Sequence, residues 1–375
     1  MAPVSDRTGE RRLGRTARVR IAVAVGVAIV VSVGVLIIVK VTSHRVDTSS
    51  AAETGKAPRN CRIEQLPVPS DSAPSTVMGM DSTGRYIIGW TPHPGSAAGL
   101  DLLIWADGGI NRAELPGEDQ VPGDVNATGV VVGTTALRSQ SGAINMQAWV
   151  YRDGTATMLQ GARSAEARAI SDFGVVVGTE GRRPALWRST SDAPSMLPMP
   201  ESAWEGTAAD ITADGRTIVG ALHPPHSALN RPYVWPVDGT PRELPLPVVE
   251  GTTALGALAV TITGDWVAGT AALTNGRDDV PVRWNLRTGE VRAFPALRIA
   301  GPKTSADGWM TARDDHGLAI LILGARATVA LPRLPDGPKR HLDVAEVISQ
   351  DGLSVAGNAS SAAAGGTLPV VWHCT

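Results

Sequence analysis

The residues of this chain that could do chemistry are few, and they lie in segments that we expect to be loops. His223-Pro224-Pro225-His226 places two imidazoles three residues apart, and imidazole is a common zinc ligand. A zinc site needs three or four ligands with supporting hydrogen bonds, whereas the two prolines make this stretch rigid and extended. The pattern favours a solvated loop over a metal site, and we expect neither a metal nor a cofactor.

Two other segments are rich in oxygen-bearing side chains. Neither Asn275–Asp279 nor Asp314–Gly317 has the alternating carboxylates of a calcium loop. The sequence also lacks nucleophile-elbow, phosphate-binding and dinucleotide-binding motifs, so no catalytic residue can be assigned. The candidates that remain are ligand-binding residues of predicted loops: His93, Glu201, Trp204, Glu205, His223, His226, Arg231, Arg277 and Asp278.

Tryptophan is the other residue type that could bind a ligand, because its ring offers a large flat surface with a polar N–H. The chain has 10 Trp, and most recur at one place in a repeated pattern, which favours packing in the core. Trp204 lies outside that register, between Glu201 and Glu205. It is the aromatic residue that we expect to contact a ligand.

The repeated pattern has three marks in a constant order. The first is a turn with Gly followed by β-branched residues that end on Gly, as in Val125–Gly133 and Ile170–Gly178. The second is an apolar strand with Trp, and the third is a strand that ends in Leu-Pro or a close variant. Seven copies occur, of which the sixth is degenerate: it ends on Ala312 and has Leu321 in place of Trp.

This repeat predicts the fold class. Each copy reads as four short strands in about 45 residues, with tight Gly-containing turns, which is typical of a β-propeller blade. The 41 Gly and 27 Pro spread along the chain agree with many short strands and turns. We therefore expect an all-β, seven-bladed propeller over residues 61–375. An open β-solenoid is the alternative.

The two ends of the predicted domain indicate how the ring closes. The chain ends soon after Trp372 without a seventh Leu-Pro strand, and that strand stands instead at Cys61–Pro67. The N-terminal strand is therefore expected to complete the last blade. Cys61 and Cys374 take the places of the two ends of the missing turn, so we expect a disulfide between them; two unrelated buried thiols are the alternative.

The N-terminal region predicts a membrane anchor. Residues 21–39 are 19 uncharged, mostly apolar residues, enough for a helix of roughly 28 Å that crosses a bilayer. Residues 1–20 carry six Arg against two acidic residues, which keeps this basic tail in the cytoplasm. The apolar run is longer than that of a cleaved signal peptide, the alternative. Residues 40–60 have linker composition, so we expect a single-pass protein of the cell membrane with residues 61–375 outside.

The charge balance narrows the partners. The net charge is -2, but from Cys61 onwards 24 Lys and Arg face 32 Asp and Glu. An acidic domain of this kind is not expected to bind nucleic acid. The expected partners are the membrane, through the anchor, and a surface protein or glycan.

The repeat resembles the HAF-repeat family of bacterial extracellular proteins, which pairs an I-N-x-x-G-x-V-V-G segment with an A-F-x-W-x-x-G-x-x-x-x-L-G segment. Val125–Gly133 and Ile170–Gly178 match the first part, and Gln147–Leu159 matches the second. The His of the family name is replaced by Gln147, Pro184 or Pro232, and Leu-Gly becomes Leu-Pro in most copies. The resemblance implies an exported propeller-like repeat domain and supplies no catalytic residues.

Loop length predicts which side of the ring binds. Connections between second and third strands and between blades should lie on one side, here called the loop face, and the short Gly turns on the other, here called the turn face. The longer connections are Thr91–Leu100, Ala136–Met146, Leu222–Arg231, Leu273–Asp279, Asn358–Gly366, Gly117–Gly123, Glu201–Thr207, Val248–Leu255 and Arg333–His341. We expect binding on the loop face.

Three functions fit these features. The first is a non-enzymatic binding module at the cell surface. The second is a hydrolase or lyase acting on envelope polysaccharide, and the third is a structural envelope component. Three or more carboxylate or histidine groups that converge near the central channel would favour the enzyme, and a flat neutral face would favour the binding module.

Overall fold

A computed structural model describes residues 57–375, apart from short segments. The segments left out are 71–73, 95–98, 116–117, 139–143, 162–163, 228, 274–278, 298–302, 325–326 and 339–341. The predicted basic tail, membrane helix and most of the linker lie outside the described residues, as do Arg277 and Asp278. Among the residues described, no helix has the length and apolar character needed to span a bilayer.

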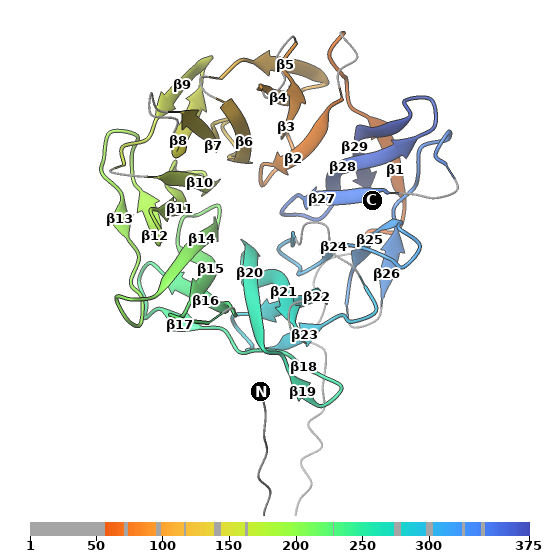
Figure 1. The fold of residues 1–375 in the computed structure, drawn as a ribbon. Coiled ribbons are helices and arrows are strands. Elements are labelled where there is room, and N and C mark those ends of the chain that lie inside the picture. Colours follow the sequence, from red (N-terminus) through yellow and green to blue (C-terminus); the bar gives the residue numbers. More distant parts are fainter. Residues whose placement is uncertain are drawn as a thin grey trace, which may run out of the picture. The chain divides into compact units, whose positions relative to one another are not determined.

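The described chain folds into seven antiparallel blades around a central axis, which confirms the predicted propeller (Figure 1). Inner strands face the axis and outer strands the rim. The first three blades are, from inside to outside, β2 (Thr76–Met80), β3 (Tyr86–Pro92), β4 (Leu100–Ala106) and β5 (Gly109–Ala113); β6 (Glu118–Val125), β7 (Val131–Arg138), β8 (Ile144–Arg152) and β9 (Thr155–Met158); and β10 (Ala165–Ile170), β11 (Val176–Glu180), β12 (Arg183–Trp187) and β13 (Ser195–Met196).

The remaining blades depart from this plan at two places. Between the fourth and fifth blades a separate hairpin is inserted, and the sixth blade has three strands in its described part. These elements are β14 (Glu205–Ile211), β15 (Thr217–His223), β16 (Arg231–Pro236) and β17 (Arg242–Glu243); the hairpin β18 (Val248–Val249) and β19 (Thr252–Thr253); β20 (Gly256–Thr263), β21 (Trp266–Ala272), β22 (Asp279–Asn285) and β23 (Val291–Ala293); β24 (Met310–Arg313), β25 (Ala319–Ile322) and β26 (Thr328–Ala330); and β27 (Val344–Ile348), β28 (Ser354–Ser361), β29 (Gly366–Cys374) and β1 (Cys61–Gln65).

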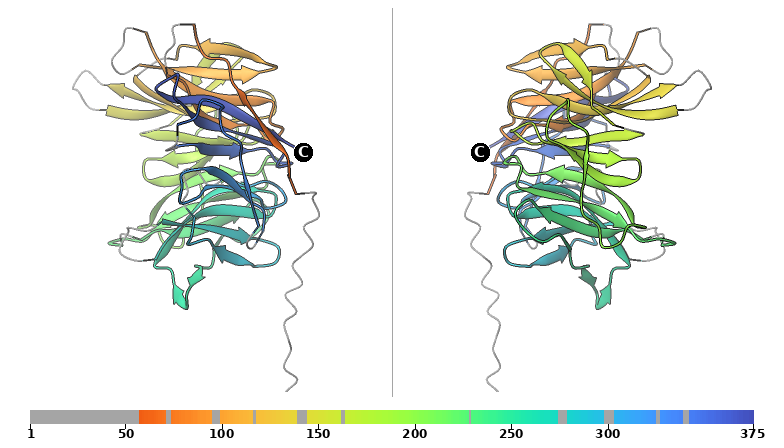
Figure 2. Two further views of the ribbon diagram at one scale, coloured as in Figure 1. Left: turned by 90° about the vertical axis from the view of Figure 1, so that its right-hand side faces the viewer. Right: turned by 90° about the vertical axis from the view of Figure 1, so that its left-hand side faces the viewer.

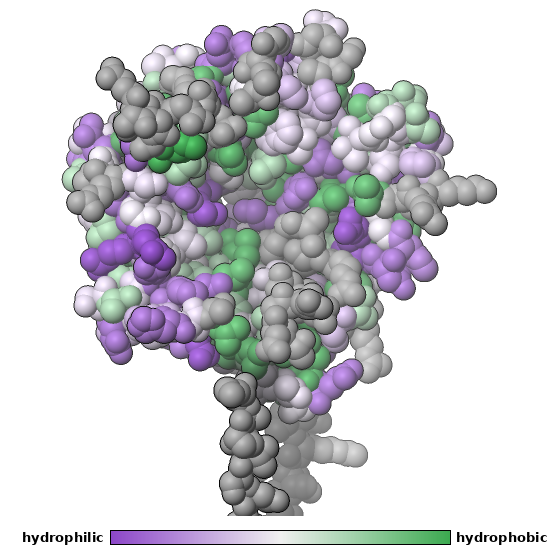
Figure 3. Space-filling model, viewed as in Figure 1, coloured by the Kyte–Doolittle hydropathy of each residue, from purple (hydrophilic) through white to green (hydrophobic). Residues whose placement is uncertain are grey.

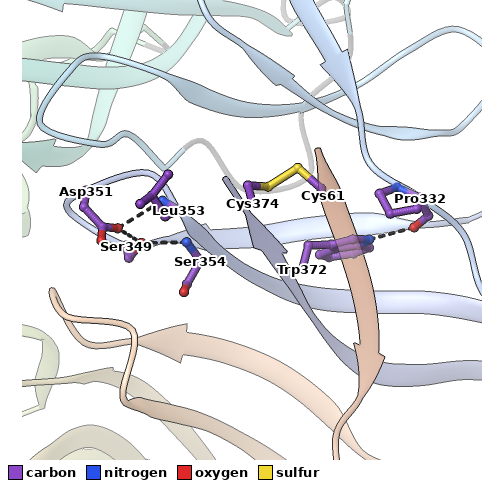
Figure 4. Close-up of a disulfide and its surroundings, with 8 residues drawn as sticks. All are labelled: Cys61, Pro332, Ser349, Asp351, Leu353, Ser354, Trp372 and Cys374. Carbon is purple, nitrogen blue, oxygen red and sulfur yellow. Dashed lines mark hydrogen bonds between the residues drawn. A yellow bond between two sulfur atoms is a disulfide. The ribbon is translucent and has the colours of Figure 1, made fainter. Parts of the chain in front are cut away.

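The seventh blade joins the two ends of the described chain, as predicted. Its sheet runs β1-β29-β28-β27, and β1 pairs with β29 from Cys61 opposite Cys374 to Gln65 opposite Val370. Cys61 and Cys374 form a disulfide with a Cα–Cα distance of 4.0 Å (Figure 4). The bond stands where other blades have a turn between their third and fourth strands, such as Asp107-Gly108, whose two residues both have positive φ.

The Gly that ends the first repeat mark is required by a close approach of two strands. Inner strands carry a β-bulge, and a Cβ on this Gly would lie 1.8 to 2.5 Å from a carbonyl oxygen of the neighbouring inner strand. The positions concerned are Gly89, Gly133, Gly178, Gly220, Gly269 and Gly357. In the sixth blade the inner strand is reduced, in its described part, to one bridge between Thr304 and Met310, and Ala312 is accommodated.

We expect Gly178→Ala to lower the free energy of unfolding by about 2–3 kcal/mol, because its Cβ would overlap the carbonyl oxygen of Glu166. Ala312→Gly is the matched control and should cost about 1 kcal/mol or less. Urea denaturation of both variants measures the difference. Equal losses would contradict the steric explanation.

The repeated Trp and Leu-Pro marks form one contact, because the Trp of one blade lies against the Leu-Pro strand of the preceding blade. In five blades the Trp of the third strand donates its Nε1–H to the carbonyl of the residue after the Leu of the preceding blade, at 2.6 to 2.7 Å. The pairs are Trp105 with Pro67, Trp187 with Gln160, Trp235 with Pro198, Trp284 with Pro245 and Trp372 with Pro332. These Trp side chains are buried, so the prediction that they form the core is confirmed.

The boundaries predicted for three connections were wrong. Gly117–Gly123, Glu201–Thr207 and Val248–Leu255 were expected to be loops, whereas β6 begins at Glu118, β14 begins at Glu205, and β18 with β19 forms a hairpin. The bulges explain the first two errors, because an extra residue breaks the alternation of apolar and polar residues that marks a strand. The inserted hairpin is short and mostly exposed, so it has no such pattern.

Figure 2 shows the ring edge-on, with the C-terminus on one side and the β7–β8 hairpin extending from the other. The C-terminal side is the turn face, because β29 runs toward it and ends at Cys374. The described chain also enters the ring there: the N–H of Arg59 donates to the carbonyl of Thr375 at 3.1 Å. The loop face is therefore opposite the point at which the N-terminal segment joins the domain.

Candidate functional site

Most of the predicted ligand-binding residues that the structure describes lie at the loop-face end of the fourth blade. Glu205 begins β14, pairs in register with His223 at the end of β15, and forms an ion pair with Arg182 of the third blade. Arg231 begins β16, and its Nη1 lies 3.6 Å from Oε1 of Glu243. His226 and Glu201 are exposed.

Trp204 lies in this group but is only half-buried, and it packs against the apolar cluster between the third and fourth blades. Part of its ring is therefore occupied by the fold and part is open to a partner. Its role as a ligand contact stays a prediction.

His93 is separate from that group, because it lies at the loop-face end of the first blade. Its Nδ1 is 2.9 Å from Oδ1 of Asp101, a buried carboxylate that also accepts a hydrogen bond from Arg112 Nε at 2.6 Å. The three side chains are linked by these hydrogen bonds at the base of the connection between β3 and β4. Among the described residues, no three His, Cys, Asp or Glu side chains are grouped so as to hold a metal ion.

A cavity of about 600 Å³ lies on the axis of the ring. It is lined by the ends of the inner strands and by the turns that follow them, so it belongs to the turn-face half of the domain. Binding was expected on the loop face, because that expectation rested on loop length. A cavity between strand ends leaves no such sign in loop length.

One position of the inner strands gives the cavity its charge. It is the residue that follows the bulge, and in three blades it is small or apolar: Gly79, Ala169 and Val347. In the other four blades the equivalent residue is polar, and all four line the cavity: Asp124, Asp210, Thr261 and Lys303. The blade architecture tolerates Gly, Ala or Val here, so it does not require charge.

The two carboxylates are held by the blade that follows each of them. Asp210 Oδ2 accepts the hydroxyl of Thr261 at 2.6 Å and the backbone N–H of Ile262 at 2.8 Å. Asp124 Oδ2 accepts the backbone N–H of Ile170 at 3.0 Å. Both aspartates therefore have fixed positions, as a binding group should.

Lys303 comes from the sixth blade and brings the opposite charge to the same cavity. Burial lowers the pKa of its ammonium, but the charges of Asp210 and Asp124 outweigh burial, so the pKa is raised. Burial raises the pKa of the Asp124 carboxyl to about 7, aided by the charge of Asp210 and opposed by that of Lys303. The three groups thus lie close enough to influence one another's protonation.

The turns around the mouth of the cavity are linked to one another. The N–H of Gln350 donates to Ser82 O at 2.8 Å, and the N–H of Ala306 donates to Gln350 O at 2.8 Å. Asp172 reaches two other blades, since its Oδ1 accepts the N–H of Ala127 at 2.9 Å and its Oδ2 accepts the hydroxyl of Ser82 at 3.3 Å. Hydrogen bonds between blades therefore frame the mouth.

The acidic side chains at the mouth are engaged differently from those inside. Asp81 and Asp214 accept backbone N–H groups of their own turns, and Asp265 forms an ion pair with Arg287. Phe173 lines the mouth with 78% of its surface exposed.

The opposite side of the ring, the loop face, is the side seen in Figure 3, which shows hydrophilic residues near the centre of the ring.

The sequence contained a signal for this site that loop length did not show. When the seven copies are aligned on their turns, Asp124, Asp210 and Lys303 share one column with Gly79, Ala169 and Val347. The remaining residue of the column is Thr261, so charged residues here stand among uncharged ones and mark a departure from the needs of the fold. Recognising the column requires the bulge, which only the structure shows.

The raised pKa of Asp124 predicts how the free energy of unfolding depends on pH. Its folded-state pKa of about 7 lies above the usual value near 4, so the folded state binds more protons between these values. Stability should therefore fall as the pH rises from 4 to 7, by about 2–4 kcal/mol from this group, and then level off. Lys303 adds no slope in this range, because its raised pKa lies far above it.

Urea denaturation at pH 5 and pH 8 tests this prediction against Asp124→Asn, which retains an acceptor for the N–H of Ile170. The free energy of unfolding should be higher for the variant than for the wild type at pH 8, where Asn removes a partly buried negative charge, and the two should differ less at pH 5. The same difference at both pH values would contradict the assignment.

Comparisons with known proteins agree with this architecture. No protein-family profile matches the chain, and no curated protein does. Among solved structures, the β-propeller domain of the Trilobed protease from Pyrococcus furiosus, which has an open velcro topology, covers 80% of this chain and 95% of its own, with 12% identity and a TM-score of 0.53. The chain is a β-propeller.

An oligogalacturonate lyase from Vibrio parahaemolyticus is also similar to this propeller. It covers 85% of this chain and 98% of its own, with 10% identity and a TM-score of 0.47. At such identities the similarities concern the fold, so the function has to be argued from the residues of this propeller.

Proposed function

We propose that this chain is a binding module, anchored in the cell membrane by residues 21–39, that presents its propeller outside the cell to a surface protein or glycan. The observation that carries the proposal is the axial cavity of about 600 Å³. Its size is that of a small-molecule site, and a few fixed polar groups converge on it. We propose that a polar group of the partner enters this cavity.

The disulfide supports the placement outside the cell, because such bonds persist in oxidising compartments. The resemblance of the blades to HAF repeats supports the same placement. Protease treatment of intact cells tests it: residues 61–375 should be digested, while an epitope tag before residue 21 stays protected. Digestion of the tag with a protected propeller would overturn the proposed orientation.

Capture of surface components tests the binding function. The immobilised full-length chain is compared with the double variant Asp124→Asn/Asp210→Asn, and Asp307→Asn is the matched control, because Asp307 lies in the equivalent turn of the sixth blade but does not line the cavity. A partner retained by the wild type and the control, but lost by the double variant, supports the proposal. Capture that is equal for all three would overturn the role of the cavity.

Trp204→Ala examines the loop face in the same assay. Loss of capture by a folded variant would show that the partner also contacts the fourth blade. Unchanged capture would remove Trp204 from the interface and leave the cavity as the binding site.

A second candidate function is favoured by the carboxylates of the cavity, because Asp124, Asp210 and the four aspartates of the mouth exceed the three convergent groups expected of an enzyme. A carboxyl with a pKa of about 7, as burial gives Asp124, can donate a proton at neutral pH, and Asp210 offers a second carboxylate in the same cavity. This arrangement fits a hydrolase or lyase acting on envelope polysaccharide. Release of sugar fragments from isolated envelopes, absent with Asp124→Asn, would support the enzyme, and no release by the wild type would exclude these substrates.

A further inference from the structure

We propose that the axial cavity binds an organic cation, a primary ammonium or guanidinium group, between the carboxylates of Asp124 and Asp210. The inference rests on the proposed function, because it takes the cavity as the binding site and names the chemistry of its ligand. The group could belong to a small amine or to a basic side chain of a partner.

The charges inside the cavity indicate the charge of the ligand. Asp124, Asp210 and Lys303 come from the second, fourth and sixth blades, at the one position where the other blades have Gly, Ala, Thr or Val. Two carboxylates and one ammonium leave a formal charge of -1. A ligand with one positive charge makes the interior neutral, whereas an anion would add to an uncompensated charge in a partly desolvated place.

The residues at the mouth of the cavity also favour a cation. Asp81, Asp172, Asp214 and Asp265 line the mouth beside Arg216, and Arg287 pairs with Asp265. Four carboxylates against two guanidinium groups leave the mouth negative, so a cation is attracted as it approaches. Phe173 stands beside the mouth as the most exposed large apolar side chain of the described residues. An exposed aromatic ring next to carboxylates suits ammonium and guanidinium groups, which bind ring faces.

The protonation of Asp124 indicates how binding of the cation depends on pH. The charged groups that face it in the cavity are Asp210 and Lys303, with Asp172 and Asp214 nearer the mouth. Because burial raises its pKa to about 7, about half of the Asp124 carboxyls carry a proton at pH 7. A bound cation favours the carboxylate, so binding should release about half a proton at pH 7 and should strengthen as the pH rises from 6 to 8.

The experiment is isothermal titration calorimetry of the full-length chain in detergent with four probes of one chain length. These are putrescine, 4-amino-1-butanol, the neutral 1,4-butanediol and the anion 4-hydroxybutyrate. The two amines should bind at least about tenfold more tightly than the diol, and the anion should not bind. Titration in phosphate and in HEPES, which differ in ionisation enthalpy, measures the protons released.

Three variants make the test specific. Asp124→Asn should weaken the amines at least about tenfold and abolish proton release, and Asp210→Asn should weaken them comparably. Asp307→Asn should bind as the wild type does, because it changes one turn-face charge outside the cavity. Thermal unfolding checks that each variant is folded.

The outcomes separate this inference from the proposed function. Equal affinity for the diol and the amines, or amine binding that neither releases protons nor changes in Asp124→Asn, would overturn the cation site. Failure of all four probes while capture of a surface component still depends on Asp124 and Asp210 would overturn the ligand class and leave the binding function in place. If no probe binds and capture does not depend on Asp124 and Asp210, both the cation site and the binding function of the cavity are overturned.

Discussion

Replacing both Cys61 and Cys374 by Ser should lower the free energy of unfolding by about 3–5 kcal/mol. The two residues are 313 positions apart, so the disulfide restricts almost the whole domain in the unfolded state. It also holds β1, an outer strand whose only described partner in the sheet is β29. Urea denaturation of the oxidised wild type and of the double variant measures the loss.

Hydrogen exchange gives a second measurement on the same pair of proteins. Without the disulfide, the amides of β1 and the facing end of β29 should lose protection first, because β1 is an outer strand that is then held by non-covalent contacts alone, namely backbone hydrogen bonds and the packing of Ile63. Wild-type protein treated with reductant should behave as the double variant does. A loss below about 1 kcal/mol would mean that the strand pairing alone closes the ring.

The fold could be predicted from the sequence because each repeat mark corresponds to a contact that most blades make. Gly178 is required by a carbonyl oxygen beside it, and Trp187 needs the carbonyl of Gln160 in the preceding blade. The sixth copy loses the Gly and the Trp together with most of the described inner strand. Its degeneracy therefore had a structural cause.

The cavity could not be predicted in the same way. Asp124, Asp210 and Lys303 lie in three different blades, and only the closed ring brings them to one axis. The sequence has 32 acidic residues in the domain, and the repeat column that sets Asp124 and Asp210 apart gains its meaning only when the structure shows that this column faces the axis. The predicted residues of the fourth blade were found together because they are close in the sequence.

The sixth blade shows how the ring is held where the Trp hydrogen bond is missing. The side chain of Leu321 has no N–H to donate, and a buried arginine acts at this junction instead. Arg283 of the fifth blade donates to the carbonyl of Gly308 in the sixth, and its guanidinium lies 4.5 Å from the ring centre of Trp266. A hydrogen bond to a backbone carbonyl of the neighbouring blade is thus kept, although the donor has changed.

Trp187→Ala should lower the free energy of unfolding by about 3–5 kcal/mol, because the side chain is fully buried between the second and third blades. Trp187→Phe keeps much of the apolar contact and removes the Nε1–H that bonds to Gln160 O at 2.7 Å. It should cost about 1–3 kcal/mol, the range for a buried carbonyl left without its donor. Urea denaturation of the two variants separates packing from the hydrogen bond.

Trp204→Ala is the matched control, since Trp204 is half-buried and lies outside the repeat. It should cost less than Trp187→Ala, because less buried surface is lost and no hydrogen bond between blades is broken. If Trp187→Phe proved as stable as the wild type, the Trp would act through its volume alone. The recurrence of Trp, rather than of any large apolar residue, argues for the hydrogen bond, because Phe or Leu could fill the space but could not join one blade to the next.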